Sequence, residues 1–141
     1  MSKIAVVYWS GTGNTERMAS KIVEGVREAG GDAVLYTAAQ FGRSMIKYYD
    51  VVVFGCPSMG AEQLEESEFA PMFENCLPEL SGRKIALFGS YGWGDGEWMR
   101  IWEEECVSRG ALLAHSSVIC REAPDGEAKS QCIDMGRALV S

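Results

Sequence analysis

The chain of 141 residues is long enough for a domain with a sizeable hydrophobic core, and we expect a single domain over 1–141. Acidic residues outnumber basic ones 20 to 13, so the net charge is −7, which argues against nucleic acid or an anionic membrane as a partner. The 5 cysteines form no C-x-x-C pair, and neither a signal peptide nor an apolar run of transmembrane length is evident, which favours a cytoplasmic protein with free thiols.

In chain order, strands are expected at 3–9, 33–36, 51–55, 84–89 and 112–119. Helices are expected at 14–29, 69–76, 97–109 and 125–140, with a weak helix or a loop over 38–49. Helical periodicity places Val107 and Ala138 on the buried faces of the last two helices. Because strands alternate with helices, the pattern predicts an α/β fold, a doubly wound three-layer sandwich around a five-stranded parallel sheet of order 2-1-3-4-5.

The loop between the first strand and the first helix has the composition of a phosphate site. Its glycines allow a close approach of the backbone, and the first N–H groups of the following helix lack intrahelical partners. A Walker loop is excluded because Asn14 stands where its Lys is needed, and a dinucleotide fingerprint is excluded because its third glycine is absent. The loop therefore suits a terminal monophosphate held by neutral donors, with the candidate residues Ser10, Gly11, Thr12, Gly13, Asn14 and Thr15.

Two further loops are expected beside it, because the loops after the first, third and fourth strands meet where the strand order reverses. One combines a soft apolar side chain, a flexible peptide and a carboxylate, in Pro57, Ser58, Met59, Gly60, Ala61 and Glu62. The other places large aromatic side chains among glycines, in Ser90, Tyr91, Gly92 and Trp93. Aromatic residues held at a surface usually have a flat partner. Together the loops predict a ligand with a phosphate at one end and a planar ring at the other, a mononucleotide or flavin mononucleotide (FMN).

Over essentially its whole length, the chain resembles the short-chain flavodoxins. The residues that carry the resemblance are the phosphate loop, Met59-Gly60 with Glu62, the run 64–69, and the glycine-rich stretch 89–96. The resemblance implies tightly bound, non-covalent FMN, with Trp93 stacked on one face of the isoalloxazine ring and Met59 on the other. It also implies that Glu62 accepts a hydrogen bond from the flavin N3–H, and that the backbone near Ser90, Tyr91 and Gly92 meets the ring or the ribityl chain.

The implied function is low-potential one-electron transfer, with the FMN passing between the neutral semiquinone and the hydroquinone. In the family, the peptide after the loop glycine, here Gly60, flips to meet the protonated flavin N5. The three loops contain no Lys or Arg, and the acidic run 62–68 should resist added negative charge while docking a basic redox partner. The carrier is expected to be a monomer, without a membrane or nucleic-acid partner.

Two other functions stay open, a small FMN-dependent NAD(P)H reductase and a non-redox mononucleotide-binding module. A phosphatase loop around Cys56 is excluded because Glu62 stands where its Arg is needed. Two departures from the family fall in the second loop, residues 57–62, which we call the flavin loop. Pro57 leaves one flavin contact in doubt. Ala61 disfavours a type II turn, and we hypothesise that it thereby raises the relative stability of the semiquinone.

Overall fold

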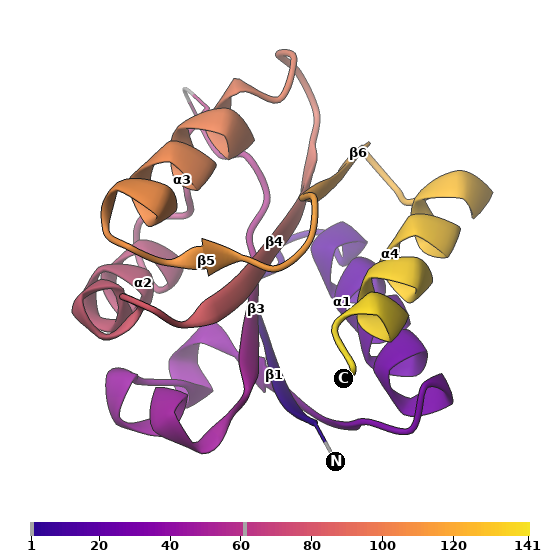
Figure 1. Cartoon of the computed structure of the whole chain (residues 1–141). Coiled ribbons are helices and arrows are strands. Elements are labelled where there is room, and N and C mark those ends of the chain that lie inside the picture. Colours follow the sequence, from indigo (N-terminus) through magenta and orange to yellow (C-terminus); the bar gives the residue numbers. More distant parts are fainter. Residues whose placement is uncertain (1, 61) are drawn as a thin grey trace.

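The computed structural model describes residues 2–60 and 62–141, and it is built around one parallel sheet (Figure 1). The strands are β1 (Lys3–Tyr8), β2 (Asp32–Thr37), β3 (Val51–Gly55), β4 (Lys84–Tyr91), β5 (Leu112–Leu113) and β6 (Val118–Arg121). The helices are α1 (Asn14–Glu28), α2 (Phe69–Cys76), α3 (Glu97–Ser108) and α4 (Gly126–Ala138). The strand order is β2-β1-β3-β4-β5, with β6 also pairing to β4, so the predicted fold class is confirmed.

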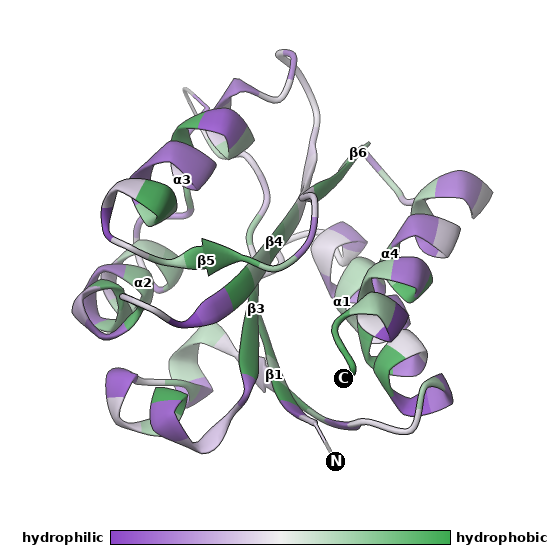
Figure 2. Ribbon diagram, in the orientation of Figure 1, coloured by the Kyte–Doolittle hydropathy of each residue, from purple (hydrophilic) through white to green (hydrophobic). Residues whose placement is uncertain are grey.

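The alternation of side chains along β1 creates two cores. Ile4 and Val6 belong to the core under α1 and α4, whereas Ala5 and Val7 belong to the core under α2 and α3. All four are fully buried, which explains why this strand is apolar throughout. Figure 2 shows hydrophobic residues along the central strands, whereas the helices that flank them carry both hydrophobic and hydrophilic residues.

The fifth strand differs from the expected continuous run 112–119. It is split into β5 and β6, and both pieces pair with β4. The intervening segment is polar, and Ser117 Oγ donates to Glu103 Oε2 at 2.5 Å, outside the strand ladder. His115, expected within the strand, lies in this break, where its Nδ1 is 2.8 Å from the carbonyl oxygen of Ser116. The N–H of Ala114 still donates to the carbonyl of Ile85 at 2.8 Å, and beyond it the local hydrogen bonds of His115 and Ser117 take the place of the ladder until β6 begins.

Three smaller differences concern helices and connections. Val107 is 56% exposed and Ala138 is also exposed, so both predicted buried positions are wrong, because each side chain lies at the margin of its helix's apolar stripe. The segment expected as a weak helix or loop forms two 3₁₀ turns, Ala38–Gln40 and Arg43–Tyr48. A third 3₁₀ turn, Leu77–Glu79, extends α2.

All five cysteines are buried and unpaired. Among the described helices, none has the length and apolarity needed to cross a bilayer.

Candidate functional site

A cavity of about 320 Å³ opens at the carboxyl ends of β1, β3 and β4, which is the switch point of the sheet. All three predicted loops contribute to it. Its lining consists of Trp9, Ser10, Gly11, Thr12, Asn14, Thr15, Pro57, Ser58, Met59, Ser90, Tyr91, Gly92 and Glu122. The parallel sheet therefore brings together side chains that are up to 113 positions apart in the sequence (Trp9 to Glu122).

At the phosphate loop, the backbone itself is the principal donor. Gly13 is the N-cap of α1 with φ 96°, a left-handed conformation that glycine adopts without strain. Ser10 Oγ accepts from the N–H of Gly13 at 3.0 Å, which leaves the Ser10 hydroxyl hydrogen free to donate. Within 2–60 and 62–141, no protein acceptor bonds to the N–H groups of Asn14, Thr15 and Glu16. These donors fit a phosphate group.

A buried hydrogen bond ties the phosphate loop to the carboxyl end of β4, where the structure places Ser90 within the strand. The hydroxyls of Thr15 and Ser90 are 3.0 Å apart, and the two residues are 1% and 5% exposed. Because both are buried, this pair fixes the relative position of two cavity walls as well as lining the cavity. Substituting either residue by Ala would leave the other hydroxyl buried without this partner.

The flavin loop is closed by a two-residue antiparallel bridge. The N–H of Met59 donates to the carbonyl of Gln63 at 2.7 Å, and the N–H of Gln63 donates back to the carbonyl of Met59 at 2.8 Å. Gly60 has φ 53°, and Glu62 has φ 54°, a left-handed conformation that is uncommon outside glycine. Ala61 lies outside the described residues, so the hypothesis about its turn stays a prediction.

Glu62 supplies the test of whether this site fits FMN. Its Oε1 is buried, and no hydrogen-bond partner for it exists among the described residues. The same oxygen lies over Gly94, where a Cβ would come within 2.5 Å of it. A buried carboxylate oxygen without a donor is costly, and the N3–H of a flavin ring is the kind of donor that would satisfy it. The residues present therefore fit the group that the sequence predicts.

The far end of the flavin loop is anchored by Glu65, a residue that the sequence interpretation treated only as part of an acidic run. Its carboxylate accepts from the N–H groups of Ser67, Glu68 and Phe69, each at 2.8 Å, and from the hydroxyl of Ser67. Burial raises the pKa of this carboxyl, but the four hydrogen bonds outweigh burial and lower it to about 2. Its N–H also donates to Cys56 Sγ at 3.3 Å, which connects the two ends of the loop.

Trp9 and Glu122 line the cavity but were not among the predicted contacts. Trp9 donates from Nε1 to Glu68 Oε1 at 2.9 Å and is also part of the cavity lining. Glu122 follows β6 with φ 59°, and its N–H donates to the carbonyl of Tyr91 at 2.7 Å. Its position after a strand end was the available signal, because every strand of a parallel sheet ends at the same edge.

Some predicted contacts lie beside the cavity and not in its lining. Trp93 is 60% exposed, and neither it nor Gly13, Gly60 or Glu62 belongs to the lining. Direct contact of these residues with FMN stays a prediction, as does stacking by Trp93 and Met59.

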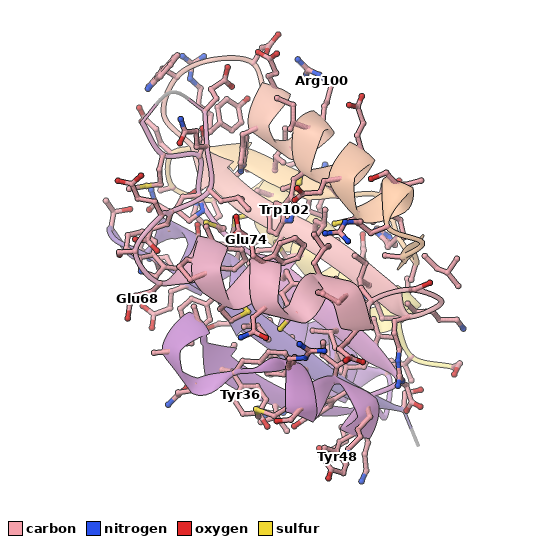
Figure 3. The ribbon with its side chains drawn as sticks, turned by 90° about the vertical axis from the view of Figure 1, so that its left-hand side faces the viewer. Tyr36, Tyr48, Glu68, Glu74, Arg100 and Trp102 are labelled. Carbon is pink, nitrogen blue, oxygen red and sulfur yellow. The ribbon has the colours of Figure 1, made fainter. Side chains whose placement is uncertain are left out.

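Three other aromatic side chains of this region pack against neighbouring rings. The Tyr91 ring packs on Trp98 with 5.4 Å between centroids. Trp98 and Trp102 are each 2% exposed, so both are packing residues of α3. Figure 3 shows Trp102 between α2 and α3, where it meets Phe69 and Phe73 edge-on.

Carboxylates gather beside the flavin loop. Oxygen atoms of Glu62, Asp95 and Glu97 all lie within 4.8 Å of one another. Arg100 reaches this group, donating to Asp95 Oδ1 at 3.1 Å, and so offsets part of its charge. The electrostatic environment remains acidic, as the composition of the loops predicts.

Comparison with known proteins gives concordant results. A family model described as Flavodoxin matches residues 6–136. A flavodoxin from Clostridium beijerinckii is 43% identical over 136 residues, covering 96% of this chain and 98% of that protein. A flavodoxin from Megasphaera elsdenii is 41% identical over 137 residues, covering 97% and 98%. The solution structure of the two-electron reduced Megasphaera elsdenii protein superposes with a TM-score of 0.88, covering 96% of each chain.

Proposed function

Because the chain belongs to the flavodoxin family, whose members bind FMN and carry electrons, we propose that it is a low-potential one-electron carrier that uses the neutral semiquinone and hydroquinone states. The observation that carries this proposal is the cavity at the switch point, with N–H groups at one end and a Glu62 oxygen nearby that have no partner in the described part of the chain. The bound FMN supplies the redox chemistry, and the chain positions it and sets its electrostatic environment.

The acidic surroundings support a low potential for the second electron. Full reduction adds negative charge to the ring, and a carboxylate about 10 Å away raises its free energy by about 1.7 kcal/mol at an effective dielectric of about 20. Glu62, Asp95 and Glu97 cluster beside the flavin loop, and Glu122 lines the cavity. Since about 1.4 kcal/mol corresponds to a factor of ten in the reduction equilibrium, a few such charges lower the potential substantially.

The partner is proposed to be a basic redox protein that docks over this acidic face, with the carrier acting as a monomer in the cytoplasm. Exposed Trp93 and Met59 provide an apolar centre for that contact, and the carboxylates beside the flavin loop, which include Asp95 and Glu97, provide its rim. The net charge of −7 suits attraction of a basic partner.

Stepwise reduction of the purified yellow protein, followed by its absorbance spectrum, tests the proposed carrier function. The expected result is a blue neutral semiquinone that accumulates to a large fraction before full reduction. Direct passage to the two-electron state would contradict the one-electron role. Rapid reduction by NAD(P)H without another protein would instead indicate the reductase.

A further inference from the structure

Arg17 lies immediately behind the phosphate loop, although it belongs to the first turn of α1 and not to the loop. Its Nη1 donates to Asn14 Oδ1 at 3.0 Å. Its Nη2 lies 3.8 Å from the position that a Cβ on Gly13 would occupy. The guanidinium therefore rests against two consecutive residues of the loop that is expected to hold the FMN phosphate.

Among residues 2–60 and 62–141, no carboxylate neutralises the charge of Arg17. In the described part of the chain, no Asp or Glu oxygen lies within 4.0 Å of its nitrogens, whereas Arg43 and Arg137 are paired with Glu79 and Glu28. The neighbouring acid, Glu16, instead accepts from the hydroxyl of Tyr8 at 3.2 Å. A positive charge thus remains beside a loop whose other groups are neutral.

The chemistry of the two side chains determines which way the Asn14 amide faces. A guanidinium has donors and no acceptor, so the Asn14 group that meets Arg17 must be its oxygen. The NH₂ of Asn14 is then left with its two donors, and Asn14 lines the cavity beside the unpaired N–H groups of the helix. The reversed amide would set NH₂ against the guanidinium, donor against donor.

We propose that Arg17 is a positioning residue for the cofactor phosphate, which holds the Asn14 amide with its NH₂ directed toward the phosphate. This inference rests on FMN binding by the family and adds a role for a residue outside the loop. Arg17 also contributes a positive charge, but the effect through Asn14 is short-ranged and should persist when salt screens that charge.

Full-length protein loaded with FMN or with riboflavin tests this role, with the dissociation constant taken from the flavin fluorescence released on serial dilution. At about 0.5 M NaCl, where the screening length is about 4 Å, Arg17→Met should weaken FMN binding about fivefold, as expected for one lost hydrogen bond. Riboflavin lacks the phosphate, and its affinity should change less than about twofold. Arg17→Lys, which keeps a donor, should restore most of the FMN affinity.

The matched control is Lys21→Met. Lys21 lies one turn further along α1 and is paired with Glu24, so removing its charge should leave both affinities unchanged. Introduced into Asn14→Ala, Arg17→Met should have no further effect on FMN at high salt. An equal loss in both backgrounds, or an equal loss for FMN and riboflavin, would overturn the proposed action through Asn14. If the unsubstituted protein bound neither FMN nor riboflavin, that result would instead contradict the family function itself.

Discussion

Among individual residues, Glu65 holds the flavin loop in place through an ionised carboxylate. The folded pKa is about 2, below the ordinary 4.5, so its contribution to stability is complete above pH of about 4.5 and disappears as the pH falls toward 2. Glu65→Gln should lower the free energy of unfolding by about 2 kcal/mol at pH 7, because hydrogen bonds to a charged acceptor are lost. Urea titrations across this pH range should show the two proteins converging in acid. Glu66→Gln removes a charge from an exposed neighbour, and a parallel loss there would contradict the role of the hydrogen bonds.

Trp102 carries a buried indole N–H that has no acceptor among the described residues, although its ring packs against Phe69 and Phe73. Trp102→Phe removes ring volume but also a desolvated N–H that costs about 1–3 kcal/mol. We expect a change in unfolding free energy below about 1 kcal/mol. Trp98→Phe, which loses a hydrogen bond to the Cys56 carbonyl at 3.4 Å, should be clearly more destabilising when measured by urea denaturation. Equal losses would show that the unmet donor of Trp102 is not a significant cost.

Among the elements, the pair α1 and α4 depends on two small residues. A Cβ at Gly25 would lie 2.1 Å from the carbonyl oxygen of Ile133, and one at Gly136 would lie 2.2 Å from that of Ile22. Gly25→Ala should therefore destabilise the protein by about 2 kcal/mol, despite the gain of about 1 kcal/mol in helix propensity. Gly126 provides the control, because a Cβ added there would meet no atom within 4 Å, and its Ala variant should be neutral or stabilising. Thermal and urea unfolding measure both effects. A stabilised Gly25→Ala protein would mean that the helices separate at little cost.

For the whole molecule, the distribution of charge should govern encounters with partners. With a net charge of −7 and clustered carboxylates beside the flavin loop, electron transfer to a basic protein should slow by roughly tenfold or more as salt rises from low to high ionic strength. The rate of electron transfer to a small uncharged oxidant should change little with salt. This comparison separates an effect on docking from an effect on the reduction potential of the flavin. Stopped-flow mixing of the reduced protein with each acceptor measures the rates. A salt-independent rate with the basic protein would contradict docking through the acidic face.

The sequence by itself determined the sheet order and the three loops of the site, because short-range patterns carry that information. Apolar runs identify strands, helical periodicity identifies their crossovers, and the composition of a loop indicates its ligand. These features do not require knowledge of which distant side chains meet. The continuous fifth strand and the buried positions of Val107 and Ala138 were wrong because side-chain hydrogen bonds and helix orientation depend on neighbouring elements.

Only the tertiary structure decided which groups meet around the phosphate loop and the flavin loop. Glu122 enters the cavity because β6 ends at the same edge as β1, and Trp9 reaches Glu68 from 59 positions away. Arg17 is different, because it lies three residues from Asn14 in α1, and this contact follows from the local geometry of a helix. Hydrogen bonds form over about 3 Å and electrostatic interactions act over about 10 Å in space, so separation along the chain does not reveal them. The chemistry of the loops could be predicted from their residues, whereas the contacts that hold those loops in position had to be observed.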